Sequence, residues 1–268
     1  MSSQTIQGLL DKMWVDYVAI NPLAQKIFNL ISQGEAGISN DHIALRTFNH
    51  PRVNIDKLAY PFIQAGYKYS GDYQFPEKKL YAKSYVHKDE KLPKIFISEL
   101  KLEEFSPELR TIVNNLINQI PGGKENSFDF VCSGRPWKVT TKIYNELMKE
   151  SDYAAWVAAF GYRPNHFTVF INNLKKFSDI RVLNEYLKAQ GFKLNSSGGE
   201  VKGSEEVLLE QSSTLANNVE VKFDDGKLTI PACYYEFAKR YPMKNKKLYQ
   251  GFVAASADKI FESTSKGQ

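Results

Sequence analysis

Two segments of the sequence repeat one another, and this repeat restricts the fold more than the propensity of any single stretch. Each copy opens with an apolar, strand-like run that contains a histidine, His42 in the first copy and His166 in the second. A helix-like run follows and closes on QAGYK in the first copy and on AQGFK in the second. The glycine of the closing sequence, Gly66 or Gly191, follows its histidine by 24 or 25 residues. The repeat therefore predicts a duplicated fold with a site between the copies.

Apolar spacing and turn residues predict the remaining elements of each copy. The first copy is expected to contain a helix at 56–65 and strands at 81–86 and 94–100. The second is expected to contain a helix at 178–190 and strands at 207–211, 219–223 and 233–238.

We expect one domain, 1–268, because helical segments surround and separate the two copies. Its predicted parts are a helical lead-in at 4–34, a first module at about 40–104, a helical insert at about 106–161 with one helix at 139–160, a second module at about 164–240, and a helical tail at 245–264.

The composition is that of an ordinary soluble protein, with 24% charged and 43% hydrophobic residues. A net charge of +5 with dispersed lysines argues against a nucleic-acid partner. The two cysteines, Cys132 and Cys233, are far apart and predict neither a disulfide framework nor a zinc site. Neither a signal peptide nor a membrane-spanning run is evident, so we expect a cytoplasmic protein without a membrane partner.

Each copy begins with a histidine and ends with a glutamate, His42 with Glu99 and His166 with Glu236. Two imidazoles and one carboxylate form the facial triad that holds iron(II) and leaves positions open. A single histidine in a strand is more often structural, but the matched positions favour a metal site. Glu99 and Glu236 compete for the third ligand, and Glu220 is a weaker candidate.

Arg46 lies four residues after His42 and therefore faces the same side of a strand. A buried arginine requires an anion, and either a structural carboxylate or a substrate carboxylate satisfies this requirement. Lys83, Ser98 and Gln211 are further polar strand residues that could line the cavity, and we include Lys83 and Gln211 among the candidate substrate-binding residues.

Three motifs, DHIALR at 41–46, NHF at 165–167 and YEFAKR at 235–240, resemble the 2-oxoadipate dioxygenase/decarboxylase family, also called hydroxyglutarate synthases. The resemblance runs from about residue 40 to 240 and implies the vicinal oxygen chelate fold. That fold is an α+β arrangement of two pseudo-symmetric βαβββ modules, here with added N-terminal, central and C-terminal helices. The chain resembles a short form, because the well-described bacterial members are considerably longer.

The resemblance implies that His42, His166 and Glu236 are the iron ligands and that Arg46 holds a substrate carboxylate. Glu99 has no ligand counterpart in the family. The implied cofactor is Fe(2+), and the implied partners are dioxygen and a 2-oxo acid. For 2-oxoadipate the products would be 2-hydroxyglutarate and carbon dioxide, an activity of lysine catabolism.

Two other classes stay open at this point, since a fold does not decide a function. One is a metal-dependent isomerase or lyase in which all four symmetric positions, Glu99 included, bind the metal. The other is a metal-free binding protein that uses the cavity alone. The substrate's identity and the formation of a homo-oligomer are also left open.

Overall fold

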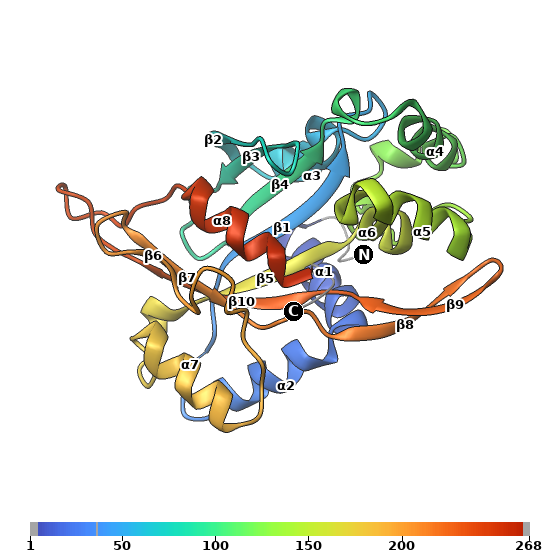
Figure 1. Cartoon of the computed structure of the whole chain (residues 1–268). Coiled ribbons are helices and arrows are strands. Elements are labelled where there is room, and N and C mark those ends of the chain that lie inside the picture. Colours follow the sequence, from blue (N-terminus) through green and yellow to red (C-terminus); the bar gives the residue numbers. More distant parts are fainter. Residues whose placement is uncertain (1–4, 36, 265–268) are drawn as a thin grey trace.

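The computed structural model describes residues 5–35 and 37–264. Its centre is a single eight-stranded sheet with the order β2-β3-β4-β1-β5-β10-β7-β6 (Figure 1). The first module supplies β1 (Asn40–Phe48), β2 (Lys68–Phe75), β3 (Leu80–Val86) and β4 (Lys94–Leu100). The second supplies β5 (Pro164–Phe170), β6 (Lys202–Ser204), β7 (Leu209–Ser213) and β10 (Tyr234–Arg240).

Equivalent strands of the two modules follow one another in opposite order across this sheet. β1 and β5, the first strands of the two modules, pair antiparallel at the centre. On its other side each pairs in parallel with the last strand of its own module, β1 with β4 and β5 with β10. The crossover helices are α3 (Ile55–Gln64) and α7 (Ile180–Ala189). The predicted α+β fold of two βαβββ modules is confirmed.

The repeated segments of the sequence have structural explanations. Every residue of β1 after its first is buried, including the polar side chains of Asp41, His42 and Arg46. Asn54 begins α3, because its side chain accepts a hydrogen bond from the Lys57 backbone N–H. Gly66 and Gly191 follow the two helices with φ of +98° and +84°. Glycine recurs there because this left-handed turn after a helix disfavours a side chain.

Two details of the modules differ from the predictions. β2 was not anticipated, although it forms the edge of the first half of the sheet. The predicted strand at 219–223 exists as β8 (Asn218–Phe223), but it pairs with β9 (Gly226–Pro231) in a separate hairpin. Because side chains along β8 alternate between exposed and half-buried, the hairpin extends from the body of the protein (Figure 1). In the second module the short β6, and not β8, is the edge strand of the sheet.

Helices outside the modules cover the sheet from both sides. They are α1 (Ile6–Ile20), α2 (Pro22–Ile31), α4 (Pro107–Ile117), α5 (Thr141–Glu150), α6 (Asp152–Phe160) and α8 (Ala254–Phe261). The single helix predicted at 139–160 is wrong in detail, because Ser151 interrupts it and caps α6. The predicted helical tail is also shorter, since α8 begins only at Ala254.

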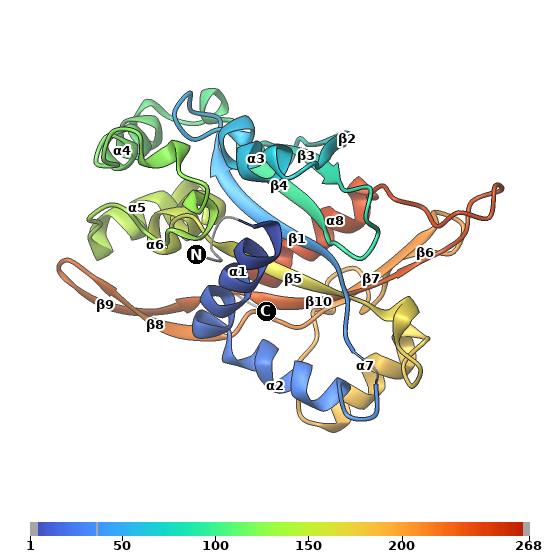
Figure 2. The ribbon, with the colours of Figure 1, turned by 180° about the vertical axis from the view of Figure 1, so that it is seen from behind.

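α8 lies on the opposite face of the sheet from α1 (Figures 1 and 2). It contacts β2 of the first module and β6 and β7 of the second, so it bridges the two ends of the sheet. The face between these ends is where the candidate residues converge. Within the described ranges, no helix has the length and apolar character needed to cross a membrane.

Candidate metal centre

His42, His166 and Glu236 converge from the three central strands β1, β5 and β10. The two Nε2 atoms lie 3.4 Å apart. Glu236 Oε1 lies 3.5 Å from His42 Nε2, and Oε2 lies 3.1 Å from His166 Nε2. Adjacent ligands on one ion, with bonds of ~2.1 Å, lie ~3.0 to 3.4 Å apart. The three side chains therefore fit a single metal ion without rearrangement of the backbone.

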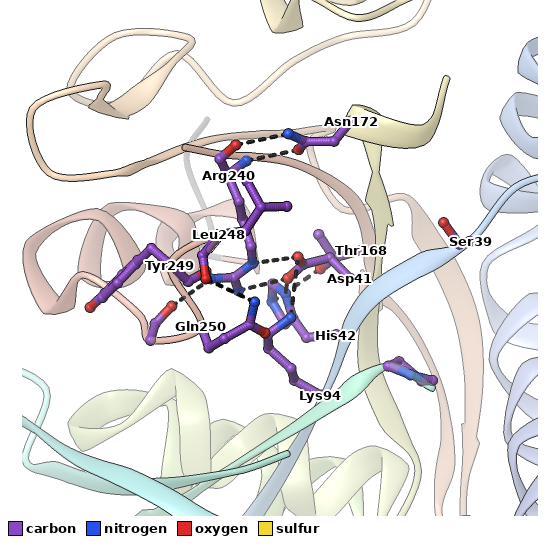
Figure 3. Close-up of polar contacts among 12 residues, drawn as sticks. Ser39, Asp41, His42, Lys94, Thr168, Asn172, Arg240, Leu248, Tyr249 and Gln250 are labelled. Atoms are coloured by element: carbon purple, nitrogen blue, oxygen red, sulfur yellow. Dashed lines mark hydrogen bonds and ion pairs between the residues drawn. The ribbon is translucent and has the colours of Figure 1, made fainter. Parts of the chain in front are cut away.

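Each histidine is oriented by the residue that precedes it. The Nδ1 atom of His42 lies 2.7 Å from Asp41 Oδ1, and that of His166 lies 3.2 Å from Asn165 Oδ1. An acceptor at Nδ1 selects the tautomer whose Nε2 lone pair is free for a metal. The Thr168 hydroxyl lies 3.1 Å from His42 Nε2, in position to donate to it (Figure 3). Burial lowers the pKa of both histidines, which keeps the imidazoles neutral.

Glu236 is a buried carboxylate, and no lysine or arginine of the described residues forms an ion pair with it. The Gln211 side chain donates to its Oε1 at 2.6 Å, while Oε2 receives no hydrogen bond among the described residues. Burial raises the pKa of Glu236 to about 8. A buried carboxylate with an orphaned oxygen beside two neutral imidazoles is electrostatically incomplete, and a bound cation completes it.

The cavity at the triad has a volume of about 20 Å³, which is room for little more than one water molecule. Tyr234 stacks on His166 with ring centroids 4.6 Å apart, and its hydroxyl has no hydrogen-bond partner in the described part of the chain. Phe252 closes another side, with its ring 4.8 Å from that of His42. Ile260 and Phe261 of α8 complete the wall. Apolar groups thus exclude water from the metal centre.

Arg46 shares the strand face of His42, as the sequence predicted, and is 4% exposed. Its guanidinium lies 5.0 Å from the ring centroids of both Tyr153 and Trp156. One nitrogen donates to the Thr264 hydroxyl at 3.2 Å, and Nε has no hydrogen-bond partner among the residues that the structure describes. Within residues 5–35 and 37–264 no carboxylate lies within ion-pair distance of it. Arg46 is therefore a buried cation without a counter-ion among the described residues.

Arg46 opens onto a larger cavity of about 330 Å³ on the far side of α8. Lys78, Lys79 and Tyr153 are among the residues that line it. Phe261 lines both this cavity and the one at the triad. The end of α8 therefore separates Arg46 from the metal centre.

The register of the two modules identifies the counterpart of Glu236. Glu236 pairs with Thr168, two residues after His166, and Phe96 pairs with Ala44, two residues after His42. The first module thus has a phenylalanine where the second has its carboxylate. Glu99, which the repeat pattern paired with Glu236, lies three residues further along β4. Its Oε2 accepts a hydrogen bond from the Ile55 backbone N–H, outside the triad.

The other polar strand residues divide between two faces of the sheet. Gln211 lines the metal cavity. Lys83 does not reach it, because side chains alternate along β3 and Lys83 binds Asp56 of α3 at 2.8 Å. Ser98 contacts the Tyr153 hydroxyl at 2.9 Å, near Arg46. Glu220 is exposed in the β8–β9 hairpin and pairs with Lys227.

Sequence reasoning missed Asp41, Tyr234 and Phe252. A local signal existed for the first two, because Asp41 precedes a candidate ligand and Tyr234 is two residues before Glu236 on the same strand face. Phe252 lies in a segment without regular structure, and no periodicity indicates where its ring points.

The family model described as 2-oxoadipate dioxygenase/decarboxylase matches residues 12–121 and 124–250. A curated relative from Arabidopsis thaliana, named 2-oxoadipate dioxygenase/decarboxylase, chloroplastic, is 33% identical over 98% of this chain and 78% of its own length. The solved structure of the hydroxyglutarate synthase of Oryza sativa, in complex with 2-oxoadipate, is 35% identical with a TM-score of 0.91, covering 96% of this chain and 91% of that one.

A structure from Shewanella frigidimarina, described only as a proposed hydrolase, is 55% identical with a TM-score of 0.90, over 94% of this chain and 99% of that one. A glyoxalase-superfamily protein from Ralstonia eutropha, 22% identical, shares the fold with a TM-score of 0.72 over 92% of this chain and 85% of that one. The family match spans nearly the whole chain, and the chain belongs to the 2-oxoadipate dioxygenase/decarboxylase family.

Proposed function

We propose that this protein is an iron(II)-dependent dioxygenase that oxidatively decarboxylates a 2-oxo acid, with 2-oxoadipate as the substrate. One molecule of dioxygen would be consumed for each 2-oxoadipate converted to 2-hydroxyglutarate and carbon dioxide. The observation that carries the proposal is the pairing of two features. His42, His166 and Glu236 offer three ligand atoms within 4.8 Å of one another, and in the described part of the chain the nearby buried Arg46 has no carboxylate within ion-pair distance.

The donor set supports iron(II) as the metal. Two imidazoles and one carboxylate on one side of an ion leave several coordination positions open, as the non-haem iron oxygenases require. Iron(II) bound there would supply the activation of dioxygen, and the 2-oxo acid would supply electrons to the oxygen as it loses carbon dioxide. The first module contributes no fourth ligand, because Phe96 stands at the position that corresponds to Glu236.

Arg46 would hold the carboxylate that lies far from the reacting end of the substrate. A guanidinium binds a carboxylate with two parallel hydrogen bonds, which fixes direction as well as distance. The rings of Tyr153 and Trp156 restrict the guanidinium, so little motion remains to be lost on binding. A dicarboxylic 2-oxo acid is therefore favoured over one with an apolar chain.

Gln211 and Tyr234 would position the groups around the metal. Gln211 fixes one oxygen of Glu236 and leaves its own carbonyl oxygen without a partner. The Tyr234 hydroxyl is an unpaired donor within the same cavity and is suited to a substrate oxygen. Phe96 and Phe252 exclude water, which protects the reaction from side products.

Substrate binding requires α8 to move. Ligand cavities usually measure ~300 to 1,000 Å³, and the space at the triad is far smaller. Adding the neighbouring cavity of about 330 Å³ reaches the lower end of that range. A substrate that spans the metal and Arg46 must therefore displace Phe261 and the Thr264 hydroxyl.

Oxygen uptake by the iron-loaded protein tests this proposal. We would purify the protein without oxygen, add iron(II), and follow oxygen consumption with 2-oxoadipate and with shorter 2-oxo acids. One 2-hydroxyglutarate and one carbon dioxide are expected per dioxygen. The Lys83→Met variant is the matched control, because Lys83 is a polar strand residue outside the cavity. Turnover with zinc or nickel and no oxygen uptake would indicate an isomerase or lyase instead, and a failure to bind any metal would indicate a binding protein.

A further inference from the structure

Asp41 joins the proposed metal ligand His42 to a buried arginine at the end of the other module. Its side chain is fully buried and contacts His42 Nδ1 at 2.7 Å. Arg240 donates to the same carboxylate through Nε at 2.5 Å and through Nη2 at 2.8 Å (Figure 3). Lys94 lies further away, with its Nζ at 3.8 Å. The arginine fork is therefore the main counter-charge of Asp41.

Arg240 uses its remaining nitrogen to hold a different part of the chain. Nη1 donates to the backbone carbonyl of Tyr249 at 2.9 Å and to that of Gly251 at 2.7 Å. Its own backbone is fixed by the Asn172 side chain, which donates to the Arg240 carbonyl at 2.8 Å and accepts from its N–H at 2.9 Å. The guanidinium is 0% exposed, and each of its three nitrogens donates.

The segment that Arg240 holds, residues 248–252, is here called the strap. It has no regular structure except a bridge between Leu248 and Pro242. Its hydrogen bonds to Arg240 are therefore among the main contacts that hold it in place. It ends at Phe252, whose ring packs edge-on to His42 and lies 4.9 Å from Phe96. α8 begins two residues later. The strap therefore fixes both one wall of the metal cavity and the origin of α8.

We propose that Arg240 is a positioning residue that couples the orientation of His42, through Asp41, to the closure of the strap over the metal centre. The proposal rests on the proposed function, because it takes His42 as a metal ligand. A planar fork is needed, since a lysine ammonium cannot reach a carboxylate through two parallel bonds and two carbonyls on the other side. A carboxylate buried beside the histidine also needs a permanent counter-charge.

The second module lacks this connection. His166 is oriented by Asn165, a neutral amide, and no arginine in the described part of the chain bonds to that amide. The coupling therefore belongs to His42 alone.

Arg52 supplies a matched control for the experiment. It bonds Glu125 through two nitrogens and the carbonyls of Ile117 and Ile120, the same kinds of partner that Arg240 has. None of these residues lines the metal cavity. Arg52→Lys should lower thermal stability and leave the metal centre unchanged.

The test compares Arg240→Lys, Arg52→Lys and the parent protein without oxygen, with cobalt(II) as the metal probe. Loss of an outer partner of a metal-bound histidine typically weakens metal binding ~10- to 100-fold. We expect that loss in Arg240→Lys, together with a changed cobalt absorption spectrum and faster amide exchange in residues 248–252. Arg52→Lys should show none of the three. Arg240→Lys with the parent's cobalt affinity, spectrum and strap exchange would overturn the coupling.

Asp41→Asn tests the same connection from the other side if Arg240→Lys fails to fold. It should weaken cobalt binding and also speed exchange in the strap, because the guanidinium loses the anion that orients it. Unchanged strap exchange in Asp41→Asn would overturn the coupling. A parent protein that binds no cobalt or iron would contradict the proposed function itself, whereas a parent that binds metal with variants that match it contradicts only this inference.

Discussion

The first and second modules have the same strand order and each contributes a histidine, yet they differ at the two positions that decide the chemistry. On the last strand of each module, one residue pairs with the position two after the histidine. This residue is Glu236 in the second module and Phe96 in the first. Four residues after the histidine the first module has Arg46 and the second has Phe170. Under the proposed function, the second module supplies the negatively charged metal ligand and the first supplies the positive charge that binds the substrate, so the site needs both.

The largest effect is expected from the paired positions Glu236 and Phe96. Glu236→Gln removes the only charged ligand, so it should weaken iron(II) or cobalt(II) binding by more than the ~10- to 100-fold typical of an outer partner. Phe96→Leu, at the matching position of the first module, should keep the metal. Equilibrium titration without oxygen compares them. Equal metal affinity in the two variants would contradict the claim that the second module supplies a metal ligand at this position and the first does not.

Arg46 provides the corresponding test of the first module. Arg46→Ala should lower kcat/KM for 2-oxoadipate by ~30-fold to several thousand-fold, since losing one partner of a buried charged pair costs ~2 to 5 kcal/mol. Arg46→Lys keeps the charge but not the fork and should lose less. Iron content should stay at the parent's level in both. If Arg46→Ala converts 2-oxoadipate as efficiently as the parent, the arginine serves structure alone.

In the metal-free protein, the buried carboxyl of Glu236 should make its own contribution to the pH dependence of stability. Burial raises the pKa of Glu236 to about 8 from an ordinary value of 4.5. Between these values the unfolded chain ionises the carboxyl and the folded chain keeps its proton, so this contribution to stability falls as pH rises from about 4.5 to about 8. Chemical unfolding at several pH values measures the slope. Glu236→Gln should remove the fall that this carboxyl contributes, and Phe96→Leu should keep it.

The smallest effect is expected at Glu99, the glutamate that closes the first copy in sequence. Its carboxylate bonds the Ile55 backbone rather than the triad, so Glu99→Gln should leave metal content and turnover near those of the parent. Metal analysis of the purified Glu99→Gln variant checks this prediction. Loss of metal there, with retention in Glu236→Gln, would reverse the assignment of the carboxylate.

The histidine pair and Arg46 could be found from the sequence because a repeat and a four-residue spacing carry that information directly. The counterpart of Glu236 could not, because Glu99 and Phe96 lie three residues apart and only strand register chooses between them. Lys83 shows the same limit. Strand alternation places it on one of two faces, but which face meets the cavity depends on packing against α3.

The C-terminal part of the site was the least predictable. Residues 245–253 belong to the predicted helical tail but form no helix; instead, Phe252 packs against His42 and the Arg240 guanidinium binds this segment. Phe252 and His42 are far apart in the chain, and nothing in the local sequence specifies their contact. The strand at 219–223 was assigned to the wrong sheet for a related reason, since a strand's propensity does not identify the strand it pairs with.

Anomalous diffraction at the iron edge, from crystals grown without oxygen in the presence of iron(II), tests the central claim most directly. One iron per chain is expected, within ~2.0 to 2.3 Å of His42 Nε2, His166 Nε2 and a Glu236 oxygen, with Phe96 facing the ion and Glu99 outside its coordination sphere. An iron that binds elsewhere, or that takes Glu99 in place of Glu236, would contradict it.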